Sequence, residues 1–295
     1  MRVNPNPLPD LISAIAQTQQ QINTDLEQIS SGESINRPSD NPAGAAILVR
    51  NTAKTSETDQ FLRSASSLSG EMQNADSALS SVVTILQRAI SLGTEGANGT
   101  SNASDRAAIA TEIQGIQSEL VGIANLSYQG NFVFAGTSTQ AAPYVLDSTS
   151  PSGVRYTGNS RVNTVTVGDH LAVQANLPGS QLFSAAGADM FQAIQNLIDN
   201  LQSGSNIDTA VNDVSTAYQH INAQRVFYGN AINQLNSQET FLNNQKTQLA
   251  DQANTVGGAD LAKVISDLVN AQSAREATLD AVSKTQQTNL FDYIK

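Results

Sequence analysis

The chain has 295 residues, which is enough for a sizeable core and for two or three domains. It contains no cysteine and no tryptophan, so disulfide bonds and thiol chemistry are excluded and bulky side chains for lining a deep pocket are scarce. Its formal net charge of −11 at pH 7 argues against binding to nucleic acid or to an anionic membrane surface.

The first residues, MRVNPNPLPDL, are not expected to act as a signal peptide, because they contain three prolines and no apolar run. The prolines predict an extended start and a helix that begins near Asp10, its N-cap, and ends at Ser31 before Gly32. Apolar residues recur in this helix at alternating spacings of four and three, which is the a/d pattern of helices that lie along other helices. This N-terminal seam consists of Leu8, Ile12, Ile15, Ile22, Leu26 and Ile29, with Gln19 at one apolar position.

A turn segment rich in Ser, Gly, Asn, Pro and Asp covers residues 30–47, and a second helix is expected after it. Asn41 and Pro42 fit the N-cap and first position of this helix, which is predicted to run to Leu92. Residues 93–105 read as a turn, with Ser104 as the N-cap of a third helix. Two helices joined by so short a loop should pack as an antiparallel hairpin.

The hydrophobic period changes between Tyr128 and Ser184, where glycine and proline recur. Short strands are predicted within residues 131–136, 154–156, 162–167 and 171–175. The segment is expected to form a small β module with a modest core, inserted between helical parts.

Helix is predicted again from Met190 to Leu201 and then over residues 206–256, which carry the longest regular seam in the chain. Gly257 and Gly258 should end that helix. A C-terminal seam follows, composed of Leu261, Ile265, Leu268, Leu279, Val282 and Leu290, with Gln272, Arg275 and Gln286 at intervening positions. Each terminal seam has too little apolar surface to fold alone, so we expect the two to pair with each other, with other copies, or with both.

The polar residues at seam positions have two interpretations. They could lie at solvent-facing or helix-end positions, or they could specify which neighbouring helix is accepted and in which register. The sequence leaves both open.

We find no candidate catalytic, cofactor-binding or metal-binding residues. His170 and His220 lack neighbours at metal-ligand spacing, so structural roles are expected for both. No phosphate-binding loop, nucleophile elbow or zinc-binding helix motif occurs, and a small-molecule substrate is not expected.

Three stretches resemble proteins of the bacterial flagellum. Residues 28–50, QISSGESINRPSDNPAGAAILVR, resemble the N-terminal segment of the flagellin superfamily. The two prolines of Arg37-Pro38-Ser39-Asp40-Asn41-Pro42, the stretch 130–137 and the ending 289–294 are more similar to the hook–filament junction family, hook-associated protein 3. The family motif residues are Ser31, Gly32, Asn36, Pro38, Ser39, Asp40, Asn41, Pro42, Phe134, Ala135 and Gly136. The proline-rich start and Asn41, in place of a second aspartate, depart from the family pattern.

This resemblance implies a structural protein that is exported unfolded, without a cleaved signal peptide, to the extracellular flagellum. Its terminal helices would pair and pack into a tube wall, as a homo-oligomeric layer between hook and filament. The implied partners are a neighbouring hook-associated junction protein, flagellin and a cytoplasmic export chaperone.

The predicted fold is mainly α with a small β insert, in which a long, antiparallel, coiled-coil-like helical rod has paired terminal helices. The expected domains are an N-terminal assembly helix (1–32), two parts of a helical rod (33–127 and 186–256), a β-rich insert (128–185) and a C-terminal assembly helix (257–295). A flagellin that builds the filament itself is the main alternative. A secreted coiled-coil adhesin or effector, and an enzyme, are the remaining ones.

Overall fold

The computed structural model describes the backbone of residues 8–292 and the side chains of residues 8–284. Leu290 therefore lies in a described helix, but its side chain is outside the described part. The chain forms two compact units. We call residues 1–57 with 245–295 the terminal unit, and residues 58–244 the central unit.

The fold is mainly helical with a few small antiparallel ribbons, as the sequence predicts. The helices are α1 (Leu8–Ser31), α2 (Pro42–Ala97), α3 (Ala103–Ala124), α4 (Gly179–Leu182), α5 (Met190–Ser203), α6 (Ile207–Gly257) and α7 (Leu261–Asp292). The strands are β1 (Ser127–Tyr128), β2 (Asn131–Phe132), β3 (Tyr144–Leu146), β4 (Val154–Tyr156), β5 (Thr164–Gly168), β6 (Leu171–Gln174), β7 (Ser184–Ala185) and β8 (Ala188–Asp189). Helices α2 and α6 each contribute to both units.

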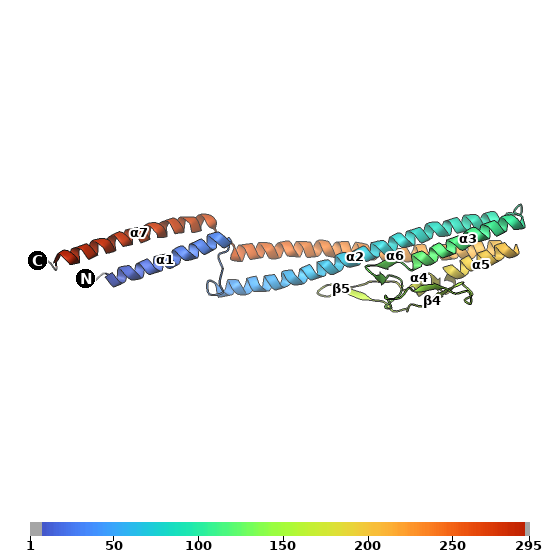
Figure 1. Ribbon diagram of the computed structural model, residues 1–295, viewed down its shortest axis with the longest axis horizontal. Coiled ribbons are helices and arrows are strands. Elements are labelled where there is room, and N and C mark those ends of the chain that lie inside the picture. Colours follow the sequence, from blue (N-terminus) through green and yellow to red (C-terminus); the bar gives the residue numbers. More distant parts are fainter. Residues whose placement is uncertain (1–7, 293–295) are drawn as a thin grey trace. The chain divides into compact units, whose positions relative to one another are not determined.

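In the terminal unit, α1 and α7 lie side by side and run in opposite directions (Figure 1). Backbone hydrogen bonds join the residues that follow α1 to the junction between α6 and α7, because Ala259 N donates to Gly32 O (3.0 Å) and Ser34 N donates to Gly257 O (2.6 Å). Helix α1 begins at Leu8 and not at Asp10, so that prediction is wrong by two residues. Pro9 falls in the first turn, where a helix loses no hydrogen bond to a missing N–H.

The turn between α1 and α2 is held by its own polar side chains. Asp40 Oδ2 accepts hydrogen bonds from Asn36 N (3.1 Å) and Arg37 N (2.8 Å). Asn41 Oδ1 accepts one from Gly44 N (2.9 Å), which confirms Asn41 as the N-cap of α2. The segment is therefore an ordered connection, and it sets where α1 ends and α2 begins.

Helix α2 continues to Ala97, five residues beyond the predicted end at Leu92. Gly93 and Gly96 do not break the helix; they let neighbouring side chains approach its backbone. A Cβ at Gly93 would lie 2.7 Å from Val211, and one at Gly96 would overlap Leu201. The predicted N-cap Ser104 is also wrong, because Asn102 caps α3 and forms a reciprocal capping box with Asp105.

The core of the central unit contains a row of α2 residues at seven-residue spacing, as the predicted seam requires. Met72, Leu79 and Leu86 are fully buried, and so are the facing α6 residues Val214 and Ile221. At the edge of this core, the Arg225 guanidinium of α6 binds the Asp76 carboxylate of α2 through two hydrogen bonds, of 2.9 and 3.0 Å. Arg225 therefore cross-links the two helices.

Four two-stranded ribbons lie on one side of the helices of this unit (Figure 1). The predicted strand over residues 131–136 is only partly correct, because β2 ends at Phe132 and the chain then runs through the core. Phe134 packs edge-on against Phe183 with ring centroids 5.1 Å apart, and Tyr144 joins the same cluster. Aromatic packing between segments far apart in the sequence thus holds the ribbons to the helices.

The half-buried carboxyl group of Glu71 gives the stability of the central unit a specific pH dependence. Burial raises the pKa of Glu71 in α2 above its ordinary value. The folded state therefore favours the protonated form, and Glu71 lowers the stability progressively as pH rises from its unfolded pKa, about 4.3, to its folded pKa.

We accordingly expect Glu71→Gln to increase the free energy of unfolding at pH 7 and to leave it nearly unchanged below about pH 4. Urea unfolding at both pH values measures this difference. Glu119→Gln, at an exposed position of α3, is the matched control and should produce no such gain. A Glu71→Gln variant that is less stable than the wild type at pH 7 would contradict the assignment.

Candidate assembly interface

The interface between α1 and α7 uses one of the two residue rows that each predicted seam contains. In α1, one row of the predicted seam faces α7. It consists of Leu8, Ile15, Ile22 and Ile29, and Ile22 is only 5% exposed. The second row that faces α7 is Leu11, Thr18 and Asp25, one residue before the predicted row Ile12, Gln19 and Leu26. Ile12 and Leu26 point outward and are 60% and 49% exposed.

The same shift occurs in α7. Leu268 and Val282 of the predicted seam are half-buried. The neighbouring row that approaches α1 is Val264, Ala271 and Thr278, and Val264 is buried. The predicted residues Leu261, Ile265 and Leu279 remain 45–50% exposed. In each helix, part of the predicted seam therefore faces the other terminal helix and part of it remains exposed.

The sequence does not distinguish the inner row from the outer one, for a physical reason. A seven-residue repeat fixes one row, and a second row can lie three or four residues further along with nearly equal geometry. The isoleucines and leucines favour the position four residues further along for this second row. The structure places it where Thr18, Asp25 and Ala271 are, so residue size gave no signal for the true inner row.

The family motif residues lie in two separate places. Ser31 to Pro42 form the end of α1, the turn and the start of α2. Pro38 and Ser39 of this group are exposed on the turn. Phe134, Ala135 and Gly136 are buried in the central unit. The first group positions the terminal helix pair, whereas the second group holds the ribbons.

Sequence reasoning missed a hydrogen-bonding centre around Gly136. Asn159 Oδ1 accepts from Thr137 N (3.0 Å) and Arg161 N (3.1 Å), and its Nδ2 donates to Ser138 Oγ (2.8 Å). The buried Asn176 donates from Nδ2 to Gly136 O (3.2 Å). Asparagines in a glycine-rich segment signal turns in general, but not which turn they will hold.

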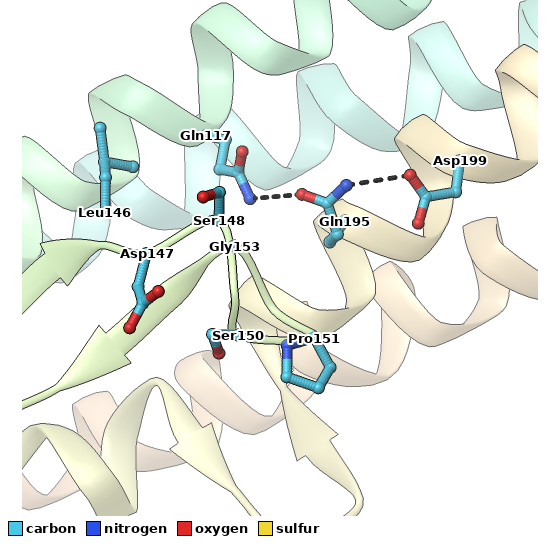
Figure 2. A pocket seen from close by; sticks show the side chains of 9 residues that line it. All are labelled: Gln117, Leu146, Asp147, Ser148, Ser150, Pro151, Gly153, Gln195 and Asp199. Carbon is cyan, nitrogen blue, oxygen red and sulfur yellow. Dashed lines mark hydrogen bonds between the residues drawn. The ribbon is translucent and has the colours of Figure 1, made fainter.

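An open hollow of about 650 Å³ lies between the β3–β4 connection and helices α3 and α5 (Figure 2). Its side chains form a relay in which Gln117 Nε2 donates to Gln195 Oε1 (3.2 Å) and Gln195 Nε2 donates to Asp199 Oδ1 (2.9 Å). Gln117 Nε2 also lies 3.2 Å from Ser152 O. These bonds hold the loop 147–153 against the two helices, so the polar groups have a structural explanation.

The two histidines do not form a site. His220 Nε2 lies 2.8 Å from Gln181 O, and His170 is exposed at the tip of the β5–β6 ribbon. No group of His, Cys, Asp and Glu suited to a metal ion occurs among the described residues. Within that same part of the chain, no helix has the length and apolar character needed to cross a membrane.

Comparisons with known proteins find similarity to proteins of the bacterial flagellum. Residues 10–139 match the family model of the bacterial flagellin N-terminal helical region. Flagellar hook-associated protein 3 of Escherichia coli K12 is 24% identical, in an alignment that covers 91% of this chain and 92% of that protein. A flagellin of Listeria innocua is 26% identical, with 89% and 87% covered.

Solved structures agree on the fold. The structure of a putative flagellar hook-associated protein from Vibrio parahaemolyticus superimposes with a TM-score of 0.68 at 21% identity. It covers 74% of this chain and 100% of its own. At this identity the likeness establishes a shared arrangement of helices and ribbons.

Proposed function

We propose that this chain, which belongs to the flagellin superfamily and is similar along nearly its whole length to flagellar hook-associated protein 3, joins hook to filament in the bacterial flagellum. It acts as a structural subunit and not as an enzyme. The terminal helix pair is the assembling part, and the chain works in the extracellular flagellum with other flagellar components.

One observation carries the proposal. The helix pair α1–α7 leaves Ile12, Leu26, Ile265 and Leu279 exposed, although each is large and apolar. Monomeric proteins rarely expose such residues in rows, and rows of this kind mark surfaces that another protein covers. A chain with this surface at both ends, and with relatives named as flagellar hook-associated proteins, fits a subunit of a helical wall.

Each part of the chain has its own role in this proposal. Residues 1–32 and 257–295 are the assembly segments. The residues that join the two segments are Leu8, Ile15, Ile22, Ile29, Leu268 and Val282. The residues that face outward are Ile12, Leu26, Leu261, Ile265 and Leu279. Residues 33–127 and 186–256 build the helical body, and residues 128–185 form the β-rich insert. We assign Leu290 to the same C-terminal assembly segment.

The partners follow from the position between hook and filament. Copies of this chain form a ring or tube layer, a neighbouring hook-associated junction protein binds on the hook side, and flagellin binds on the filament side. A cytoplasmic chaperone covers the apolar helix surface before export, which proceeds without a cleaved signal peptide. A net charge of −11 supports solubility on this route and disfavours nucleic acid.

The main rival is a flagellin, because flagellins also match across most of the chain. Immunogold labelling of intact flagella with an antibody to residues 128–185 separates the two functions. We expect label only in a short zone between hook and filament. Label along the filament would contradict the junction function and favour the flagellin. A secreted adhesin or effector predicts normal swimming after deletion of the gene.

A further inference from the structure

One asparagine of the chain is followed directly by glycine, in the pair Asn98-Gly99. The pair lies in the connection between α2 and α3, which belongs to the central unit. Both residues are exposed, and no atom lies within 4 Å of the position that a Cβ on Gly99 would occupy. The Asn98 side chain and the peptide bond that follows it are therefore open to water.

The hydrogen bonds of this connection leave the Asn98 amide group little restrained. Asn98 N donates to Glu95 O (3.2 Å), and Ser101 N donates to Asn98 O (2.9 Å). The side chain takes part through Oδ1, which accepts from Thr100 N at 3.3 Å, beyond the usual range for such a bond. These bonds involve neither the Nδ2 of Asn98 nor the backbone nitrogen of Gly99.

This arrangement permits a reaction between the side chain and the backbone. Gly99 N loses its proton to hydroxide and forms a bond to Asn98 Cγ. The bond from Cγ to Nδ2 then breaks, and Nδ2 takes up a proton from water and leaves as ammonia. The product is a five-membered cyclic imide. Water opens the imide at Cγ to give aspartate, or at the main-chain carbonyl carbon to give isoaspartate, in which the backbone runs through Cβ.

Glycine favours this reaction because it leaves the attacking nitrogen unobstructed. Any other residue at position 99 would carry a Cβ next to that nitrogen and would crowd its approach to Cγ. Glycine also has the widest choice of backbone conformations, so the connection can bring Gly99 N onto Asn98 Cγ at the smallest conformational cost.

Other asparagines that precede a small residue are held in place. Asn102 caps α3, and its Oδ1 accepts from Ser104 N (2.8 Å) and Asp105 N (3.0 Å). The Nδ2 of Asn159 donates two hydrogen bonds of 2.8 Å. Asn236 lies within α6, where the helical backbone keeps the following nitrogen away from the side chain. At Asn98 alone do a following glycine, exposure and a weakly held amide coincide.

We infer that Asn98 is a site of spontaneous deamidation in the folded chain. The reaction adds one negative charge, and the isoaspartate product adds one carbon atom to the backbone. Both backbone hydrogen bonds described above run through residue 98, so isoaspartate alters the connection that follows α2. The reaction needs only water and the folded chain, so the inference is independent of the proposed function.

Peptide mapping of the purified, full-length protein tests this inference. The protein is incubated at physiological temperature and mildly alkaline pH, and a sample digested before incubation gives the baseline. Trypsin cleaves after Arg88 and Arg106, so Asn98 and Asn102 fall in the same peptide. Tandem mass spectrometry locates a gain of about 1 Da, the difference between an amide and an acid. Electron-transfer fragmentation distinguishes isoaspartate from aspartate.

We expect the gain at Asn98 to grow with time and to form roughly tenfold faster than at Asn102, a difference of about 1.4 kcal/mol in activation free energy. Isoaspartate and aspartate should both appear. An unchanged Asn98, or one that reacts no faster than Asn102, would overturn the inference. Aspartate without isoaspartate would also overturn it, because direct hydrolysis of the amide gives aspartate only.

Gly99→Ala is the matched variant. It should fold as the wild type does, because the added Cβ meets no atom, and circular dichroism checks this. Deamidation at Asn98 should slow roughly tenfold in this variant, by the same 1.4 kcal/mol or about that amount. Equal rates in the variant and the wild type would show that the attack by residue 99 does not occur.

Discussion

Replacing Phe183 by alanine should lower the free energy of unfolding by about 3–5 kcal/mol, the range found when a large buried aromatic ring is removed. Phe183 is fully buried. Its ring centroid lies 5.1 Å from that of Phe134, 5.8 Å from Tyr144 and 6.4 Å from Phe191. The variant therefore loses one ring from the centre of the cluster that holds the ribbons to α5.

Chemical unfolding followed by circular dichroism measures the effect. Phe241→Ala, which removes the same side chain from a 60% exposed position of α6, is the matched control and should change stability by less than about 0.5 kcal/mol. Equal losses in the two variants would mean that the aromatic cluster is not the core of this region.

The second large effect is expected at Gly136. Its φ of +70° is in the left-handed region, which costs about 1–3 kcal/mol for other residues. A Cβ there would also overlap the carbonyl oxygen of Asn159, which accepts a hydrogen bond from the Tyr156 hydroxyl (2.9 Å). Overpacking of this kind adds about 1–3 kcal/mol, so Gly136→Ala should cost at least about 2 kcal/mol in all.

A substitution at Gly187 measures the cost of the backbone conformation without the cost of the steric overlap. Its φ of +78° imposes a similar backbone conformation, but no atom lies within 4 Å of its Cβ position. Gly187→Ala should therefore show the conformational cost alone, about 1 kcal/mol. If urea unfolding finds equal losses for the two variants, the close approach of Asn159 has no energetic weight.

The helices were predictable because they depend on local patterns. Seven-residue spacing located α6 and the core row of α2, and Asn41 and Gly257 marked helix ends correctly. The predictions fail where contacts with residues distant in the sequence determine the local structure. Gly96 reads as a turn residue from the sequence alone, yet it lies within α2, where Leu201 occupies the space that a Cβ would need.

The candidate site was predictable only to the level of the helices. Periodicity identified α1 and α7 as an assembling pair, but it could not tell the inner row from the outer one. That choice depends on how α7 lies against α1, which the backbone bonds at Gly32 and Gly257 determine. The aromatic cluster was also hidden, because Phe134, Tyr144, Phe183 and Phe191 come from four separate segments.

The division of each terminal helix into an inner and an outer row links the fold to the function. Inner rows of modest apolar character let the two ends of one chain find each other. Outer rows of isoleucine and leucine remain exposed, and we propose that a neighbouring subunit covers them. Dilute monomer should accordingly show weak hydrogen-exchange protection in residues 8–30 and 260–292, and the protection should rise on assembly.

If this chain joins the filament to the hook, a strain from which its gene has been deleted should lack attached filaments. Electron microscopy of that strain measures this. We expect hooks that end without filaments, with filaments restored when the full chain is supplied. Hooks that carry intact filaments in the deletion strain would contradict it.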